Sequence, residues 1–397
     1  MRTPRLTDER GMALAVAIFA LVIIGALVAG AFYAGTLEQR TGRNTLYSAE
    51  AAQAAEAGAP AVLANWDAYA LNNIGNNTTT SLGTSYMTGR TDMKYTTSAT
   101  RLNTQLFLIS SLGSRIDAGG NELAQRTVAT LARLSYVSAT AKAAVTVTKP
   151  ITFNGNTFGI IGNDSIPKGW DKDSLGNADP NCTKGADVAG IRSATTTGAN
   201  NGDLTKISGS PKVVANDPTV TNDFFNIFGD VTFDELKKNA DIVISATTPQ
   251  KPAPTLLAAA PFRCNTGDAN NWGEPSRAAG YVKACSTYFP IIYASGSQLK
   301  LAGGARGQGL LLVEGDLEIV GGFEFSGLIV AKGGIKIAGN GNKVTGALLA
   351  QDVAIDDQNT ISGNTTLQFS SCALNKAIQG SAFAEPLAFR SWAQLQY

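Results

Sequence analysis

An uncharged apolar run near the start of the sequence places the strongest constraint on what this chain can fold into. From Met12 to Gly35 there is no charged side chain, and Ala, Leu, Val and Ile predominate. About 24 residues of helix span roughly 36 Å, which is enough to cross the hydrocarbon core of a bilayer. We therefore expect a transmembrane helix over residues 12–35.

The charges before this run predict which way the helix crosses. Arg2, Arg5 and Arg10 stand there against Asp8 and Glu9, and a basic excess favours the cytoplasmic side. We expect a single-pass protein with a cytoplasmic N-terminus and an exported remainder. A permanent signal anchor is one alternative. Another is a secretory signal cleaved after the small residues 29–31, although such signals normally have apolar regions of only about 7 to 15 residues.

The composition excludes several functional classes. The 32 basic and 31 acidic side chains give a net charge of +1, which argues against nucleic acid as a partner, because nucleic-acid binders need a concentrated basic excess. The chain has no histidine, so it can form no Ser-His-Asp triad, no Cys-His dyad and no His-ligated zinc site. Its 42 glycines and 14 prolines predict a turn-rich, mostly β protein. We expect no enzymatic activity, no metal and no cofactor.

Apolar residues recur every eighteen positions between Ile292 and Ile361. The three rows of this repeat are Leu299, Leu317, Ile335 and Val353; Leu301, Ile319, Ile337 and Ile355; and Ala294, Leu312, Val330 and Leu348. Short apolar runs separated by glycines are typical of strands rather than helices. We predict a parallel β-helix over residues 291–372, with about four coils stacked roughly 4.8 Å apart and the right-handed form favoured. An antiparallel meander is the alternative.

Helix formers continue over residues 36–71, after the apolar run. Ala51, Ala55 and Ala59 recur there at the spacing of one helix face, and small residues allow close packing. Pro60 is expected to kink or restart this helix, because proline removes a backbone donor.

A small β region is predicted over residues 90–150, after a polar stretch at 72–89 that is expected to be a loop. Within this region, the β-rich runs 101–109 and 125–134 flank a turn composition at 117–121. They are predicted to pair as a hairpin.

The remaining segments are a middle region over 151–290, rich in Asn, Asp, Gly and Pro, and a C-terminal tail over 373–397. One short helix is predicted at residues 233–238, capped by Thr232 or Asp234. The predicted fold class is therefore α+β and mostly β.

The four cysteines are Cys182, Cys264, Cys285 and Cys372. They lack the C-x-x-C spacing of zinc or redox sites and all lie in the part expected to be exported, so two disulfides are the leading interpretation. Pairing Cys264 with Cys285 closes a short loop, and Cys182 with Cys372 then fastens the middle region to the end of the solenoid. The sequence permits three connectivities.

Charged residues on the repeat predict a ladder rather than a catalytic site. At eighteen-residue spacing, Glu318 falls between Lys300 and Lys336, and Glu314 falls beside Lys332. Alternating signs in neighbouring strands favour pairing.

Two carboxylates support an alternative function. Asp316 and Asp352 would lie two coils apart, at roughly 10 Å, and form the one candidate pair for glycosidase chemistry. The alternative is a permanently anchored surface protein whose β-helix binds or cleaves carbohydrate.

Three motifs lie in the first 65 residues. Residues 9–14 read ERGMAL, a short charged leader and a glycine before the apolar helix, which is the order that prepilin peptidases recognise. Residues 36–40 read TLEQR, and residues 51–58 read AAQAAEAG. This start resembles type IV pilins and, among them, PilX-type minor pilins. The resemblance implies a leader over residues 1–11, with cleavage between Gly11 and Met12.

One position departs from the pilin pattern. Most pilins carry a glutamate at the fifth mature position, where this chain has Val16. The departure is similar to PilX-type pilins and to the K-type minor pseudopilin of type II secretion, and it implies a minor rather than a major subunit.

Two segments of the C-terminal half carry a second resemblance. Residues 307–317 read GQGLLLVEGDL and residues 370–374 read SSCAL, which is similar to PilX-like and pilus-assembly proteins. The repeat alone also resembles cytoskeletal bactofilins, but the membrane segment and the cysteines disfavour a cytosolic polymer.

The resulting hypothesis is a minor pilin-like component of a type IV filament system, with a structural, assembly or adhesive role. It would sit in a bacterial inner membrane, with its bulk in the periplasm or at the cell surface. The partners implied are the inner membrane, other pilin subunits, the prepilin peptidase and, for adhesion, surface carbohydrate.

Overall fold

The chain forms two compact units. The helix–sheet unit comprises Met1–Asn65, Asn76–Ala132 and Pro386–Tyr397, and the solenoid unit comprises Trp66–Gly75 and Arg133–Glu385. Most of the solenoid unit is thus inserted between two segments of the helix–sheet unit. The computed structural model describes residues 10–72, 74–103, 105–135, 141–154, 157–172, 178–179, 182–196, 198–200, 204–229, 231–245, 248–259, 262–276, 281–350, 359–362, 364–380, 382–387 and 391–395.

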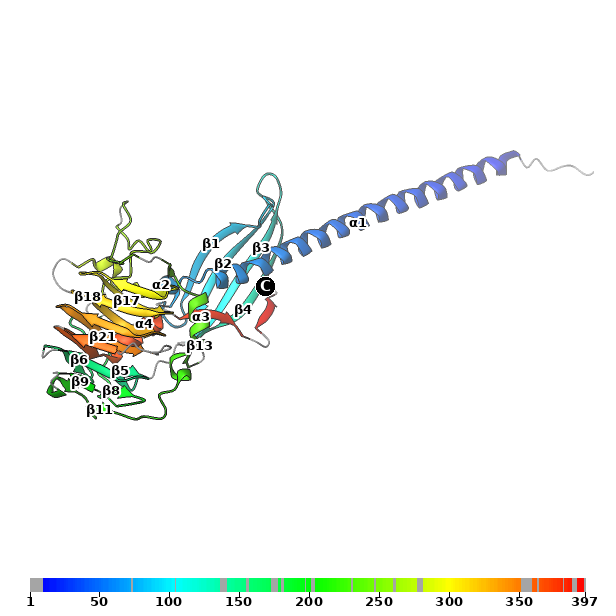
Figure 1. The fold of residues 1–397 in the computed structure, drawn as a ribbon. Helices are drawn as coiled ribbons and strands as arrows, with labels where there is room; N and C mark the ends of the chain where they lie inside the picture. The colour runs from blue at the N-terminus through cyan, green and yellow to red at the C-terminus, as the bar shows by residue number, and fades with distance from the viewer. Residues whose placement is uncertain are drawn as a thin grey trace, which may run out of the picture. The chain divides into compact units, whose positions relative to one another are not determined.

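One long helix, α1 (Arg10–Ala64), contains the whole apolar run and continues beyond it (Figure 1). An 18-residue window of this helix has a mean hydropathy of 2.8 and is not buried, so the helix is long and apolar enough to cross a membrane. The helix passes through Pro60 and ends at Ala64, and α2 (Ala68–Leu71) follows. The helical continuation predicted over residues 36–71 is interrupted as expected, but the break comes about one turn after the proline, and the helix restarts at Ala68, about two turns after it.

The helix–sheet unit contains a sheet in which β1, β2, β3 and β4 are neighbours in that order. The strands of this sheet are β1 (Thr79–Tyr86), β2 (Met93–Arg101), β3 (Leu106–Ile116), β4 (Glu122–Ser135), β24 (Phe383–Pro386) and β25 (Trp392–Leu395). The pairs β1–β2, β2–β3 and β4–β25 are antiparallel. The predicted hairpin and its turn at 117–121 are confirmed as β3 and β4, with a hydrogen bond from the Asp117 N–H to the Asn121 carbonyl closing the turn. The bounds of the first run are wrong, because Arg101 ends β2 and β3 begins at Leu106.

The loop predicted over residues 72–89 is wrong for its central part, because β1 occupies residues 79–86. Two of its Thr side chains find partners on β2: the hydroxyls of Thr79 and Thr100 lie 2.8 Å apart, as do those of Thr84 and Thr96. Cross-strand threonine pairs stabilise a sheet, so a polar composition here marks a solvent-facing strand and not a loop.

The small-residue face of α1 packs on this sheet. Ala51, Ala55 and Ala59 are at most 1% exposed. A Cβ atom on Gly113 of β3 would lie 2.1 Å from the Ala51 carbonyl oxygen, and one on Gly58 would lie 2.1 Å from a β3 serine hydroxyl. The helix and β3 therefore approach so closely that neither glycine can be replaced without a shift.

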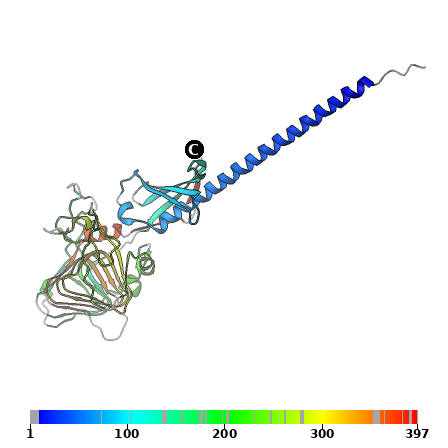
Figure 2. The same cartoon turned by 90° about the horizontal axis from the view of Figure 1, so that it is seen from above.

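The solenoid unit is a β-solenoid of about eight turns built from parallel strands. One sheet has the order β10-β7-β23-β21-β19-β17-β15-β14 and another β16-β18-β20-β22-β6-β9, while β5, β8 and β11 branch from the first. In Figure 2 the view runs along the stack, and the turns superimpose. The strands are β5 (Ala143–Val147), β6 (Ile151–Asn154), β7 (Gly159–Ile161), β8 (Ala189–Ser193), β9 (Gly198–Asn200), β10 (Ile207–Ser208), β11 (Val213–Val214), β14 (Ile242–Ile244), β15 (Ile291–Ala294), β16 (Gln298–Leu301), β17 (Arg306–Val313), β18 (Asp316–Val320), β19 (Glu324–Ala331), β20 (Ile335–Ala338), β21 (Asn342–Ala350), β22 (Asn359–Ser362) and β23 (Thr365–Phe369).

The eighteen-residue register is confirmed for part of the stack and corrected elsewhere. The pairs Leu299–Leu317–Ile335 and Leu301–Ile319–Ile337 form as predicted. The third predicted row slips by one residue at two steps, because Ala294 pairs with Val313 and Val330 pairs with Leu349. In the second row, Ile361 rather than Ile355 stacks on Ile337. Val353 and Ile355 lie outside the described residues.

Two chain segments build the stack. Strands β14 to β23 stack in sequence order, and then β5 stacks on β21, β6 on β22 and β7 on β23. β8, β9 and β10 add the next layers. In Figure 1 the colour along the stack therefore passes from yellow through orange to the blue-green of β5 and β6. The middle region expected to be separate from the β-helix supplies several of its turns, so the solenoid has about twice the predicted four coils.

A column of glycines lets the long strands bend. Gly309, Gly327 and Gly346 are paired in register and have φ values of 106°, 137° and 133°. L-residues rarely adopt this conformation. A Cβ atom on Gly327 would lie 2.1 Å from the Gly309 carbonyl oxygen, and one on Gly346 would lie 1.9 Å from the Gly327 carbonyl oxygen.

Short elements complete the solenoid unit. The helix predicted at residues 233–238 is confirmed as α3 (Phe233–Lys238), and its cap is Thr232, which forms a reciprocal capping box with Glu235. The second helix, α4 (Ser371–Gly380), follows β23 and contacts β17, β19 and β21. The remaining elements are β12 (Ile227–Phe228), β13 (Val231–Thr232) and the 3-10 helices η1 (Leu204–Lys206), η2 (Asn222–Phe225) and η3 (Lys283–Cys285).

Candidate functional sites

The predicted cleavage point lies at the start of α1. The helix begins at Arg10, so Gly11 and Met12 fall in its first turn. Val16, which stands where most pilins have a glutamate, is 65% exposed. Cleavage between Gly11 and Met12 stays a prediction.

The apolar run of α1 presents its side chains outward along its whole length. Its large side chains are between 43% and 72% exposed, and they are Leu14, Val16, Ile18, Phe19, Leu21, Val22, Ile23, Ile24, Leu27, Val28, Phe32, Tyr33 and Leu37. Burying apolar surface is worth about 25 cal/mol per Å², and an apolar surface of this extent marks a membrane or protein contact. The run is therefore suited to a bilayer or to a bundle of similar helices.

An ion network joins α1 to β3 and to the loop between β1 and β2. Glu50 on α1 binds Arg115 at 2.6 Å and Arg90 at 3.0 Å. Asp92 binds the same two arginines, at 3.0 Å and 2.7 Å. Hydrogen bonds from Arg90 hold the pKa values of Glu50 and Asp92 below their usual range. The network therefore fixes the position of α1 along its axis relative to the sheet. Its ion pairs require that both carboxylates are ionised.

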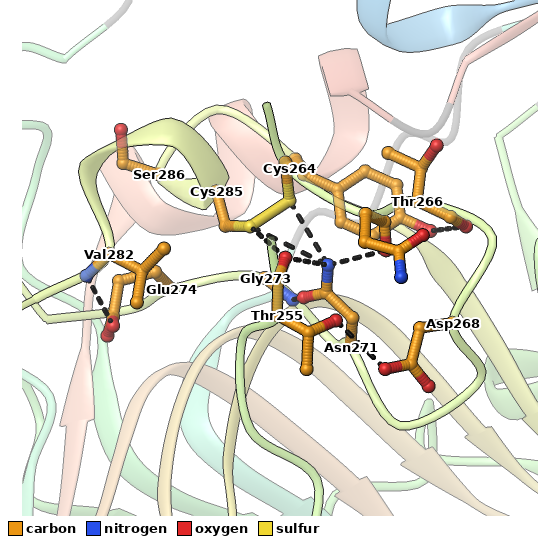
Figure 3. Close-up of a disulfide and its surroundings, with 12 residues drawn as sticks. Thr255, Cys264, Thr266, Asp268, Asn271, Gly273, Glu274, Val282, Cys285 and Ser286 are labelled. Atoms are coloured by element: carbon orange, nitrogen blue, oxygen red, sulfur yellow. Dashed lines mark hydrogen bonds between the residues drawn. A yellow bond between two sulfur atoms is a disulfide. The ribbon is translucent and has the colours of Figure 1, made fainter. Parts of the chain in front are cut away.

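The disulfide pairing is the one that the sequence favoured, Cys264 with Cys285 and Cys182 with Cys372. Around the first of these, Asn271 is completely buried and donates from Nδ2 to the Asn265 carbonyl at 2.8 Å and to the Cys264 sulfur at 3.1 Å (Figure 3). Its Oδ1 accepts from the Gly273 N–H at 3.0 Å. The disulfide and this amide together hold a loop that has little regular secondary structure.

A buried carboxylate holds the far side of the same loop. Glu274 is completely buried, and one of its oxygens accepts a hydrogen bond from the Val282 N–H at 3.0 Å (Figure 3). Its other oxygen accepts from the Ser276 N–H at 3.1 Å. Arg306 lies 3.7 Å away and supplies the opposite charge. Both oxygens of the buried acid therefore have a hydrogen-bond donor, and the contacts hold the segment from Glu274 to Val282.

The second disulfide joins the two chain segments of the solenoid. Cys182 lies between β7 and β8, and Cys372 lies in α4, directly after β23; their Cα atoms are 4.4 Å apart. Beside them, Asp164 accepts hydrogen bonds from the Ser371 N–H at 2.8 Å and the Ser371 hydroxyl at 2.5 Å. The start of α4 is therefore fixed both covalently and by a buried carboxylate.

The predicted charge ladder is present on the solenoid. Glu318 binds Lys300 at 3.1 Å and stands in register with Lys336, and Glu314 binds Lys332 at 3.2 Å. These ion pairs join neighbouring turns across the sheet.

Of the carboxylate pair considered for glycosidase chemistry, the described residues contain Asp316. Asp316 accepts a hydrogen bond from the Gly334 N–H at 2.8 Å, which is a turn contact between adjacent coils. Asp352 lies outside the described residues.

Sequence reasoning missed Asn271, Glu274 and Asp164, the buried polar groups that hold the loops. Each is a single polar residue in a segment without regular secondary structure, so no repeating sequence pattern distinguishes it from its neighbours. The one signal was the Asn- and Asp-rich composition of the middle region.

The comparisons with known proteins are sparse. No protein-family model and no curated protein matches the chain. One solved structure that it is similar to is the competence-associated pilin ComZ from Thermus thermophilus, with 13% identity, 88% of this chain and 97% of that chain covered, and a TM-score of 0.22. A TM-score of this size is too low to support an argument about fold or function.

Proposed function

We propose that this protein is a minor pilin-like component of a type IV filament system, with a structural, assembly or adhesive role. The observation that carries the proposal is the design of α1. One unbroken helix has an uncharged, outward-facing apolar half and a second half whose small residues pack under an antiparallel sheet.

This division suits a subunit that moves from a membrane into a filament. The apolar half can exchange lipid for the apolar helices of neighbouring subunits without a change in its own fold, because both surroundings are apolar. The other half is held to its sheet by alanine packing and by the Glu50 network, so it would remain attached during that exchange. The solenoid unit is then carried as a rigid, disulfide-closed head with no catalytic role.

The proposal places the N-terminus in the cytoplasm and the solenoid unit in the periplasm or at the cell surface. The basic residues before the apolar run and the two disulfides support this orientation, since disulfides persist in oxidising compartments. It further proposes cleavage after Gly11 by a prepilin peptidase and contacts with other pilin subunits.

Sequencing the mature N-terminus tests the proposal. The full chain is expressed with and without a prepilin peptidase, and the purified protein is examined by intact mass and N-terminal peptide mapping. We expect loss of residues 1–11 and a new terminus at Met12, in the presence of the peptidase alone. A Gly11→Val variant should stay uncleaved, whereas Gly25→Val, inside the apolar run where no atom lies within 4 Å of an added Cβ, should be processed normally.

An intact N-terminus in cells whose peptidase processes another pilin would refute the filament proposal and favour the permanent anchor. Orientation is checked separately by alkylating intact cells and lysates with a maleimide. Free thiols at Cys264 and Cys285 in freshly lysed cells would contradict an exported head.

A further inference from the structure

A pocket in the solenoid unit combines aromatic and acidic walls. It has a volume of about 220 Å³ and lies between α2, the disulfide-closed loop and the end of α4. Its aromatic lining residues are Trp66, Tyr288 and Phe289, and its acidic lining residues are Asp67 and Asp241. None of these residues takes part in the predicted cleavage site or in the charge ladder.

The aromatic walls are held in place before any ligand arrives. The indole N–H of Trp66 donates to Asn72 Oδ1 at 2.9 Å, and Asn72 in turn donates to the Gln379 and Ala382 carbonyls at 2.8 and 2.7 Å. Phe289 packs edge-on against the buried Trp170, with ring centroids 5.6 Å apart. A preformed wall lowers the entropic cost of binding.

The two carboxylates keep oxygen atoms available. Asp67 uses Oδ1 to accept from the Ala70 N–H at 3.0 Å, and Asp241 uses Oδ2 to accept from the Ile291 N–H at 2.8 Å. In the part of the chain that the structure describes, neither forms an ion pair, and no Lys or Arg lines the pocket.

Tyr288 contributes a neutral wall. Burial, followed by the negative charges of Asp241 and Asp67, raises the pKa of Tyr288, so its phenol stays uncharged at neutral pH. Its hydroxyl faces the Thr266 carbonyl, 3.4 Å away. Burial also raises the pKa of Asp241, so a cation in the pocket would favour the ionised form of that carboxyl. The pocket therefore offers ring surfaces and two carboxylates, with no countercharge among its described lining residues.

We propose that this pocket binds an alkylammonium cation of about the size of a choline headgroup. Aromatic faces attract such cations through the ring quadrupole, and the carboxylates supply the opposite charge. A volume of about 220 Å³ is below the usual range for drug-sized ligands and suits a small headgroup. An anion would meet two like charges.

Choline and its uncharged carbon isostere, dimethylbutanol, test the proposal on the full chain in a polyoxyethylene detergent. Binding is measured by calorimetry and by saturation-transfer NMR of the methyl signals. We expect choline to bind about tenfold or more tightly than the isostere, because a desolvated cation–π contact with a carboxylate nearby is worth at least one factor of ten. A trimethyl-lysine amide distinguishes a protein side chain from a lipid or polysaccharide headgroup as the natural source, and binding of either cation supports the proposal.

A double variant, Asp67→Asn with Asp241→Asn, removes both charges and keeps the shape and the acceptor oxygens. It should lose most of the preference for choline, keeping only the part that the aromatic rings supply, and bind the isostere as the native protein does. Glu324→Gln, an ion-pair residue on β19 outside the pocket, should leave both affinities unchanged. Equal affinity for choline and isostere, tighter binding of glucose or N-acetylglucosamine than of either cation, or no cation binding at all would overturn the proposal.

Discussion

Replacing Gly327 with alanine should strongly destabilise the solenoid unit. The residue has a φ of 137°, and an added Cβ would lie 2.1 Å from the Gly309 carbonyl oxygen and 3.1 Å from the Cβ of Ala377 on α4. The first contact is with backbone in the adjacent turn, so no side chain can rotate away to relieve it. Backbone strain of this kind costs about 1 to 3 kcal/mol, and overpacking adds about 1 to 3 kcal/mol.

The sum, about 2 to 6 kcal/mol, should lower the unfolding temperature of a unit of this size by about 5 to 20 °C. Tryptophan fluorescence during heating is a suitable assay, since Trp170 and Trp272 are each 1% exposed and both lie in the solenoid unit. Gly159→Ala is the matched control, because it lies on β7 of the same stack with no atom within 4 Å of an added Cβ. If the two variants unfold at the same temperature, the column of Gly309, Gly327 and Gly346 does not constrain the strands as argued.

Three further changes test other contacts. Glu50→Gln should flatten the pH dependence of the stability of the helix–sheet unit, because hydrogen bonds from Arg90 lower the pKa of Glu50. The stability that Glu50 contributes is complete above its ordinary pKa of 4.5 and is lost as the pH falls through the lowered value. Hydrogen exchange of β2 and β3 measures this loss. Gly113→Ala should speed exchange of the same strands and cost about 1 to 3 kcal/mol, since the new methyl meets the backbone of α1. Replacing Cys182 and Cys372 together with serine opens a loop spanning 190 positions, and the chain-entropy relation gives a loss of about 5 kcal/mol in denaturant titrations.

Local chemistry made several elements predictable. A charge-free run can be read as a helix without tertiary information, and α3 follows from Thr232 and Glu235 at capping-box spacing. The pairing of Cys264 with Cys285 was favoured because a short loop is easily closed. Each of these signals lies within about 25 residues of sequence.

The turns contributed by residues 143–214 were not predictable in this way. Val145 pairs with Ile191, 46 positions later, and Ile160 pairs with Ile207, 47 positions later. The long excursions between these strands conceal the period that is evident between Leu299 and Leu317. The two one-residue slips in the third row could not be seen either, because the extra residues fall at the turns between strands, at 295–297 and 339–342, where they do not disturb the apolar pattern.

The two-segment order of the stack has a physical reason in the insertion of the solenoid between β4 and β25. An inserted unit is tolerated when its two ends lie close together. If eight turns followed one another in simple sequence order, the first and last strands would be about seven steps apart, or roughly 34 Å at about 4.8 Å per step. Here β23 and β5 both stack on β21, so the chain enters and leaves the solenoid in the same layer. The disulfide from Cys182 to Cys372 joins the chain segment after β7 to the segment after β23. Because the chain enters and leaves the solenoid in one layer, a solenoid of many turns can be inserted between β4 and β25.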